Sequence, residues 1–225
     1  MQSAKQTKPY STSRSYHGKS AEARRRARRE KLIAAGIQLI GTQGFASTSL
    51  NALCQEAGLT KRYFYESFES MEALLTAAFG SISEALQQHV IRHINAHSQP
   101  KAMIEAGFRG FFEYIQAHPE QGRVYLVEAL SVHSLRHQLL GSGGGEVSAF
   151  LLQTTQQYLP KDAPVAPEIL AIIAQGAVGA AVFVGQNWIA SDFEQPMEEL
   201  VTAVSEICFG IAQRLNIPLD RGRHP

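Results

Sequence analysis

Residues 47–75 constrain the fold of this chain more than any other segment. Ser49 stands before apolar residues at helical spacing, so its hydroxyl can cap the first turn of a helix. Those apolar residues are Leu50, Leu53, Cys54 and Ala57. Gly58 can end this helix in a left-handed conformation, and Thr60 can cap a new one two residues later. The segment therefore predicts two short helices on a tight glycine turn.

The second of these helices, predicted over residues 61–67, separates a core face from a free face. Phe64 and Phe68 lie four residues apart and can pack inward on Leu53 and Ala57. The outward and rim positions then belong to Lys61, Arg62, Tyr63 and Tyr65. Cations and hydroxyls suit DNA phosphates and base edges, so we interpret the segment as a helix-turn-helix whose second helix enters the major groove. The alternative is a solvated charged face on an ordinary helical hairpin.

This stretch resembles the DNA-binding domain of the TetR (tetracycline repressor) family of transcriptional regulators. The resemblance covers about residues 26–80 and is carried by Gly44, Phe45, Thr48, Ser49, Leu53, Cys54, Ala57 to Thr60, Tyr65, Phe68, Ser70 and Glu72. Cys54 departs from the family's small alanine, and Met71 stands where the family usually has a lysine that neutralises a phosphate. We expect DNA contacts from Arg28, Thr48, Ser49, Thr60, Lys61, Arg62, Tyr63, Tyr65 and Ser70.

The expected fold is all-α, with about nine helices. At 225 residues and 44% hydrophobic, the chain can form one small and one medium domain. We predict a disordered basic arm (1–20), a three-helix DNA-binding domain (21–69, with the helix-turn-helix at about 49–68), a C-terminal effector-binding and dimerisation domain (70–217) and a disordered tail (218–225). The helices are expected at about 21–43, 70–96, 101–117, from Pro119, at 167–190 and at 195–215.

Charge is distributed unevenly along the chain. Residues 1–31 hold ten Lys and Arg against two Glu, a net charge of +8, whereas residues 32–225 hold eleven against eighteen Asp and Glu, a net charge of −7. Because the basic segment leads into the predicted DNA-binding helices, we interpret it as an electrostatic footprint for DNA rather than only a solvated tail.

The chain has no run of eighteen apolar residues and begins with a polar, basic segment. We expect a cytoplasmic protein with no membrane partner. Cys54 and Cys208 are the only cysteines, and both lie on apolar helical faces. Buried free thiols are therefore expected, rather than a disulfide or a metal site. The run Gly141–Gly145 is either a loop or a hinge.

Two C-terminal helices are expected to form a homodimer interface. Glycines recur inside the helix at 167–190, which suggests that another backbone comes close. The next helix repeats apolar residues near heptad spacing. TetR-like proteins dimerise through two such helices, and the predicted interface comprises Gly176, Gly179, Val182, Val204, Ile207 and Ile211. The alternative is that both faces are used inside one subunit.

The family resemblance also implies that the body holds a small-molecule effector. Predicted ligand-binding residues are His89, His93, Phe111, Phe112, Tyr125, His133, His137, Phe150 and Phe183. Aromatic residues at helical spacing can equally be simple core. The pairs His89/His93, His93/His97 and His133/His137 have the spacing that lets two imidazoles reach one metal ion. No cysteine or carboxylate cluster is evident beside them in the sequence, so we predict no metal and no cofactor.

These residues together predict a sequence-specific transcriptional regulator that binds double-stranded DNA. The family resemblance implies a repressor that an effector releases from a palindromic operator, although the residues themselves do not distinguish a repressor from an activator. An enzyme is disfavoured, because no phosphate-binding loop, nucleophile elbow or placed pair of acids is recognisable. A nonspecific or architectural DNA-binding protein remains the alternative, and it predicts little sequence preference.

Overall fold

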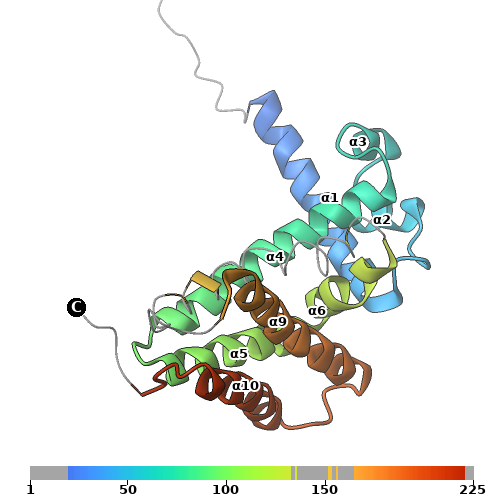
Figure 1. Cartoon of the computed structure of the whole chain (residues 1–225). Helices are drawn as coiled ribbons and strands as arrows, with labels where there is room; N and C mark the ends of the chain where they lie inside the picture. Colours follow the sequence, from blue (N-terminus) through green and yellow to red (C-terminus); the bar gives the residue numbers. More distant parts are fainter. Residues whose placement is uncertain (1–19, 133–134, 136–151, 154–155, 157–164, 221–225) are drawn as a thin grey trace, which may run out of the picture.

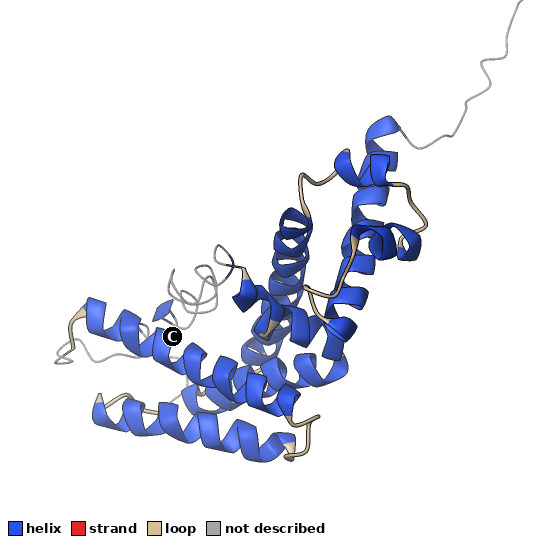
Figure 2. Cartoon of the chain, turned by 90° about the vertical axis from the view of Figure 1, so that its right-hand side faces the viewer, coloured by secondary structure: helices blue, strands red, loops and turns tan. Residues whose placement is uncertain are grey.

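The computed structural model describes residues 20–132, 135, 152–153, 156 and 165–220, and every regular element among them is a helix (Figures 1 and 2). The predicted all-α class is confirmed. Three predicted ligand residues, His133, His137 and Phe150, lie outside the described residues, as do the run Gly141–Gly145 and residues 1–19 of the predicted arm.

Three helices form the N-terminal head: α1 (Ala21–Gln43), α2 (Leu50–Glu56) and α3 (Lys61–Tyr65). The turn between α2 and α3 has the predicted geometry. Gly58 has φ +63°, and the N–H of Leu59 donates to the carbonyl of Cys54 at 2.9 Å. This bond satisfies a terminal carbonyl of α2 and ends the helix, as expected for a left-handed glycine stop.

The head has its own small core. Side chains from α1, α2, the segment around α3 and the start of α4 (Met71–Asn95) bury one another there. Its most buried members are Leu32, Leu53, Phe64, Phe68 and Leu74. The predicted inward packing of the two phenylalanines is confirmed, with 1% of Phe64 and 5% of Phe68 exposed.

Helix α4 joins the head to the body. Near its start, Leu74 lies in the head core, close to α1 at Gly36. Further along, Ile82, Leu86 and Val90 belong to the larger core of the body. A 25-residue helix is about 37 Å long, so one rigid element spans both domains.

The body is a bundle in which α5 (Pro100–Ala117) packs between α4 and α10 (Met197–Arg214). Helix α6 (Pro119–Leu126) contacts α1 of the head and α9 (Pro167–Ala190), and a 3-10 turn follows it at Glu128–Ser131. In Figure 1, α9 and α10 lie side by side at the end of the molecule away from α3.

Helix α9 is unusually apolar for its degree of burial. By length and composition it could cross a membrane: its most apolar window has a mean hydropathy of 1.9, and a third of that window is buried. A core helix of a soluble bundle meets the same criterion. The burial is one-sided, because Leu170, Ala174 and Val182 are covered while Ile172 and Phe183 are exposed.

Candidate DNA interface and ligand cavity

The outer face of α3 presents cationic and phenolic side chains around a buried anchor. Phe64 holds the helix from behind, while Lys61 and Arg62 are exposed and Tyr65 is 62% exposed. The short helix is thus fixed by its apolar side and leaves its polar side accessible. This is the arrangement that reading a DNA groove requires.

Helix α1 is fastened to α3 through Glu66 and Tyr63. The Arg28 guanidinium lies 4.4 Å from the centre of the Tyr63 ring and 3.5 Å from the Glu66 carboxylate. Arg25 donates to the backbone carbonyl of Glu66 at 3.0 Å. Arg28, predicted to contact DNA, is therefore already engaged inside the head, where it positions α3.

Arg62 has more freedom. Its side chain is 85% exposed and its Nε lies 3.2 Å from the Glu66 carboxylate, one helical turn away. An exposed pair of this kind contributes about 0.3–0.5 kcal/mol, so a phosphate or a guanine edge can displace Glu66 at little cost.

The hydroxyl residues predicted to touch DNA fall into two groups. Ser49 and Ser70 are N-caps, accepting hydrogen bonds from the N–H of Ala52 and Ala73, whereas exposed Thr60 makes no capping bond through its side chain. These positions put hydroxyls at the starts of α2, α4 and α3. N-terminal amides and cap hydroxyls at such places can hold a phosphate.

Thr48 requires a correction. Its side chain is 7% exposed, and its hydroxyl donates to the carbonyl of Gly44 at 2.8 Å and accepts from Gln43 at 3.2 Å. The turn after α1 occupies this hydroxyl fully. Thr48 therefore shapes the head rather than offering a free contact.

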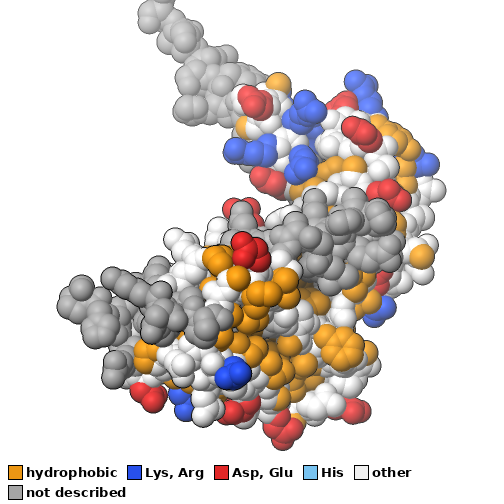
Figure 3. All heavy atoms as spheres, viewed as in Figure 1, with side chains coloured by type: hydrophobic (Ala, Val, Ile, Leu, Met, Phe, Trp, Pro, Cys, Tyr) orange, Lys and Arg blue, Asp and Glu red, His pale blue; other side chains and the backbone are white. Residues whose placement is uncertain are grey.

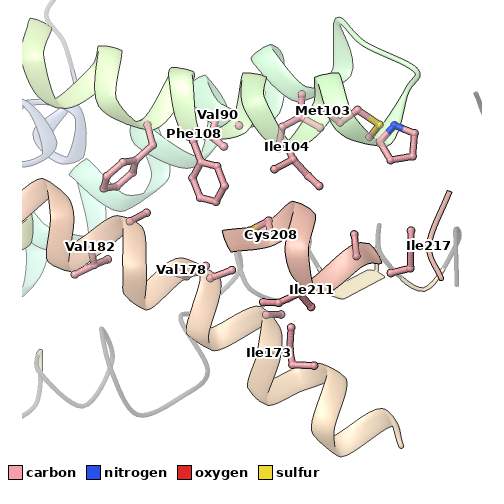
Figure 4. A pocket seen from close by; sticks show the side chains of 18 of the residues that line it. Val90, Met103, Ile104, Phe108, Ile173, Val178, Val182, Cys208, Ile211 and Ile217 are labelled. Carbon is pink, nitrogen blue, oxygen red and sulfur yellow. The ribbon is translucent and has the colours of Figure 1, made fainter. Parts of the chain in front are cut away.

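A cavity of about 170 Å³ lies in the body between α4, α5, α9 and α10 (Figure 4). By a measure on which one water needs roughly 10–15 Å³, this space could hold on the order of ten waters. Its walls include Val90 and Ile94 on α4, Met103, Ile104 and Phe108 on α5, Val178 and Val182 on α9, and Cys208 and Ile211 on α10. Ile217 and Leu219, beyond α10, complete one end.

The cavity is apolar and carries no charged side chain among its lining residues. The Tyr125 hydroxyl is hydrogen-bonded to Ser83, while burial raises the pKa of this phenol. Burial also raises the pKa of Cys208 to about 11, so its thiol is neutral at physiological pH. The described walls of the site can therefore bury hydrocarbon, and none of their side chains is an ionic partner.

The sequence identified two of the lining residues correctly, Phe111 and Tyr125. Phe112 is fully buried, with its ring 5.8 Å from Trp188, and belongs to the core. Phe183 is 64% exposed on the outer face of α9. Both of these ligand predictions are wrong, because each side chain lies on a different face of its helix from the cavity.

His89 and His93 do not line the cavity either. They lie on the side of α4 that faces α5, where His93 Nε2 is 3.4 Å from the Glu113 carboxylate. The two imidazole rings lie 4.7 Å apart. Their prediction as residues of the ligand cavity is therefore corrected, although they do form a polar cluster elsewhere.

Sequence reasoning missed the contribution of α10 and the chain that follows it. Cys208, Ala212 and Leu215 line the cavity, and the carbonyl of Leu219 accepts a hydrogen bond from the N–H of Lys101 at the start of α5. The apolar repeat of α10 is evident in the sequence and predicts a subunit interface, whereas the structure uses part of this apolar face to line the cavity.

The predicted dimer residues divide between an open face and the interior. Gly176, Gly179 and Ile207 are exposed, and a Cβ added at either glycine would meet nothing within 4 Å in the described chain. Val182 and Val204 are buried, and Ile211 lines the cavity. The interface prediction is wrong for these last three, because α9 and α10 use those faces inside the subunit.

The head and the body also differ in the side chains that they expose. In Figure 3, Lys and Arg side chains gather on the head, while hydrophobic side chains gather over the part of the body that holds α9 and α10. The exposed large hydrophobic residues include Ile169, Ile172 and Phe183 on α9 and Ile207 on α10.

Comparison with known proteins agrees with this two-part architecture. The profile described as "Bacterial regulatory proteins, tetR family" matches residues 32–78, which run from α1 into α4. The HTH-type transcriptional regulator BetI of Rhizobium meliloti is 27% identical over 99 residues. That match covers 44% of this chain and spans about half the length of the relative (49%).

Solved structures extend the likeness to the body. The fatty acid degradation regulator FadR from Bacillus halodurans has a TM-score of 0.66 at 16% identity, covering 80% of this chain and 93% of its own. FadR from Bacillus subtilis, solved in complex with stearoyl-CoA, has a TM-score of 0.61 at 16% identity over 79% of this chain and 96% of its own.

The helix-turn-helix lies on a head with its own core, a helical body lies behind it, and both parts match regulators of one kind. This combination is a tetR-type DNA-binding head on a helical body that contains an apolar cavity. The head, over residues 32–78, is a DNA-binding domain of the tetR family of bacterial regulatory proteins.

Proposed function

We propose that this chain is a transcriptional repressor that binds a palindromic operator as a homodimer and is released when an apolar small molecule fills the body cavity. One observation carries the proposal: α4 contributes both to the head core, through Leu74, and to the cavity wall, through Leu86, Val90 and Ile94.

This double role of α4 supports a mechanical link. Leu74 is fully buried and lies about 3.0 Å from where a Cβ at Gly36 would stand, so α4 cannot move without moving α1. A ligand that separates α4 from α9 would therefore rotate the head. A preference of 1–3 kcal/mol for the rotated state weakens DNA binding by roughly 5- to 150-fold.

The lining supports a hydrocarbon as the occupant. Because none of the described wall residues is charged, their contribution to affinity has to come from apolar surface buried at about 25 cal/mol per Å². A linear acyl chain fits this requirement, with a polar head left outside. Bacillus subtilis FadR was solved with stearoyl-CoA, which makes that compound a reasonable probe, although the likeness itself extends only to the fold.

The outer face of α9 supports a homodimer. Ile172, Gly176, Gly179 and Phe183 follow one another at spacings of four, three and four, so they form one exposed stripe next to Ile207 of α10. An apolar stripe with small residues lets two copies approach closely around a two-fold axis. The two heads could then reach half-sites about 34 Å apart.

The test uses the full chain and a duplex selected from a genomic pool. Mobility shifts are measured during titration with stearoyl-CoA, with coenzyme A and stearate in parallel. We expect stearoyl-CoA or stearate to release the duplex and coenzyme A to leave it bound. Ala177→Phe, which places a ring in the cavity, should abolish release, whereas Ala85→Phe on the exposed side of α4 should preserve it.

Two results would contradict the proposal. If the chain binds random and selected duplexes equally at fixed salt, it is a nonspecific DNA-binding protein. If no hydrocarbon ligand alters the affinity for the selected duplex, release by cavity occupation is wrong. A reporter placed behind the selected site separates repression from activation.

A further inference from the structure

A polar cluster joins α4 to α5 on the side away from the cavity. It consists of His89 and His93, one turn apart on α4, and Glu113 on α5. One ligand atom from each of the three side chains lies within 4.8 Å of the other two. The sequence shows the histidine pair but does not show that an acid from the next helix meets it.

The helices approach closely here because of a glycine. A Cβ added at Gly110 would lie 2.9 Å from Cγ of His93, so the imidazole occupies the space that a side chain on α5 would take. This packing fixes the His93 ring and brings its Nε2 to 3.4 Å from Glu113. The side chains of His93 and Glu113 remain 28% and 37% exposed, so an ion can reach them from solvent.

His89 contributes an unsatisfied donor or acceptor. Its Nε2 is buried without a hydrogen-bond partner among the described residues, and its ring lies 5.7 Å from that of Tyr114. A buried polar atom without a partner is costly, and an unoccupied ion site is one physical reason for it.

We propose that His89, His93 and Glu113 form a binding site for a divalent transition-metal ion that bridges α4 and α5. Two imidazoles and one carboxylate are a ligand set used for Zn²⁺, with a fourth position left for water. Bonds of about 2.0 Å require the ligand atoms to stand roughly 3.3 Å apart, so side-chain torsions must shorten the longest distance in the cluster by up to about 1.5 Å.

Arg92 and His118 also lie close to this site. Arg92 is exposed and its Nη2 lies 3.5 Å from His89 Nδ1, so it must swing away when the ion binds. His118 acts on His89 electrostatically and packs against the far side of Tyr114 at 4.9 Å. Glu113 supplies the only carboxylate of the cluster, and its removal should therefore be especially damaging.

The experiment is calorimetric titration of the tag-free full chain with Zn²⁺ after treatment with a chelator. We expect one ion per chain. His93→Gln and Glu113→Gln should each weaken binding by about 10- to 100-fold or more, because each removes a direct ligand. Glu113→His should restore it, since imidazole is also a ligand of Zn²⁺.

His97→Gln is the matched control, because His97 lies four residues beyond His93, just past the C-terminal end of α4, and is exposed and outside the cluster. This variant should bind Zn²⁺ like the wild type. Circular dichroism verifies that each variant keeps its helices. The proposal is overturned if the wild type takes up no Zn²⁺, or if His93→Gln and Glu113→Gln bind it as tightly as His97→Gln. Neither result bears on the apolar effector.

Discussion

The backbone N–H of Phe45 donates a hydrogen bond of 2.9 Å to the carboxylate of Glu128, a residue 83 positions away. Phe45 lies in the turn that ends α1, and Glu128 begins the 3-10 turn after α6. Arg123 also approaches this carboxylate, at 3.5 Å. A single side chain, 13% exposed, therefore fastens the head to the body beside the contact between α1 and α6.

Glu128→Ala should lower the free energy of unfolding by about 1.5–3 kcal/mol, because it leaves the Phe45 N–H without its charged acceptor. Glu128→Gln retains an oxygen that can accept this bond and should lose much less. Urea denaturation followed by circular dichroism measures both changes. If both variants lost the same free energy of unfolding, the stabilisation would come from the charge of Glu128 and not from its hydrogen bond to Phe45.

Gly41 marks the tightest contact between head and body. A Cβ added there would lie 2.5 Å from the carbonyl oxygen and 2.6 Å from Cα of Glu120, both backbone atoms of α6. Gly41→Ala must push α1 from α6 and should destabilise the fold by about 1–3 kcal/mol, despite the better helix propensity of alanine.

Gly80→Ala is the control for that change. Gly80 is exposed in the middle of α4, and no atom of the described residues lies within 4 Å of a Cβ placed there. This substitution should stabilise the protein by about 0.5–1 kcal/mol through helix propensity alone. Chemical denaturation of both variants checks the pair. A Gly41→Ala variant as stable as Gly80→Ala would mean that α1 and α6 separate without cost.

The head could be predicted from sequence because its signals are local. Ser49 caps α2, Gly58 ends it and Phe64 anchors α3, all within a few residues of one another. The body was harder, because neighbouring aromatic residues have opposite fates that only packing decides. Phe111 reaches the cavity while Phe112, one position on, lies under Trp188.

Contacts between distant segments could not be predicted at all. Nothing near His93 in the sequence indicates Glu113, which reaches it because Gly110 allows α5 to approach. Likewise, the sequence shows that α9 and α10 are apolar. Which of their apolar residues line the cavity and which are exposed depends on where α5 packs. Val204 and Ile207, three residues apart, are 1% and 50% exposed.

The cavity should also give the protein a distinctive response to alkaline pH. Burial raises the pKa of Cys208 from 9.0 to about 11, so the folded state holds this proton when the unfolded state has lost it. The resulting contribution to stability is complete below about pH 9 and is lost as the pH rises towards 11; it amounts to at most about 2–3 kcal/mol.

Cys208→Ala removes the thiol and with it this pH-dependent contribution to the free energy of unfolding. The loss of stability between pH 9 and 11, measured by urea denaturation at each pH, should be smaller in this variant than in the wild type. Tyr125 and Tyr114, whose pKa values burial also raises, contribute equally to both proteins and cancel in the comparison. Parallel pH profiles would show that the thiol ionises as freely in the folded chain as in the unfolded one.

The DNA interface gives the last prediction. Arg62 is highly exposed, and among the described residues Glu66 is its one ion-pair partner. Arg62→Ala should therefore change the fold little and cost about 1–3 kcal/mol in binding to the selected duplex if it contacts a base. Discrimination between selected and altered duplexes should fall with it.

Arg214→Ala, which removes an exposed cation at the end of α10, is the matched control and should bind DNA as the wild type does. A uniform weakening across all duplexes, with a shallower dependence on salt, would instead assign Arg62 to a phosphate. Unchanged affinity on every duplex would mean that this face of α3 does not meet DNA.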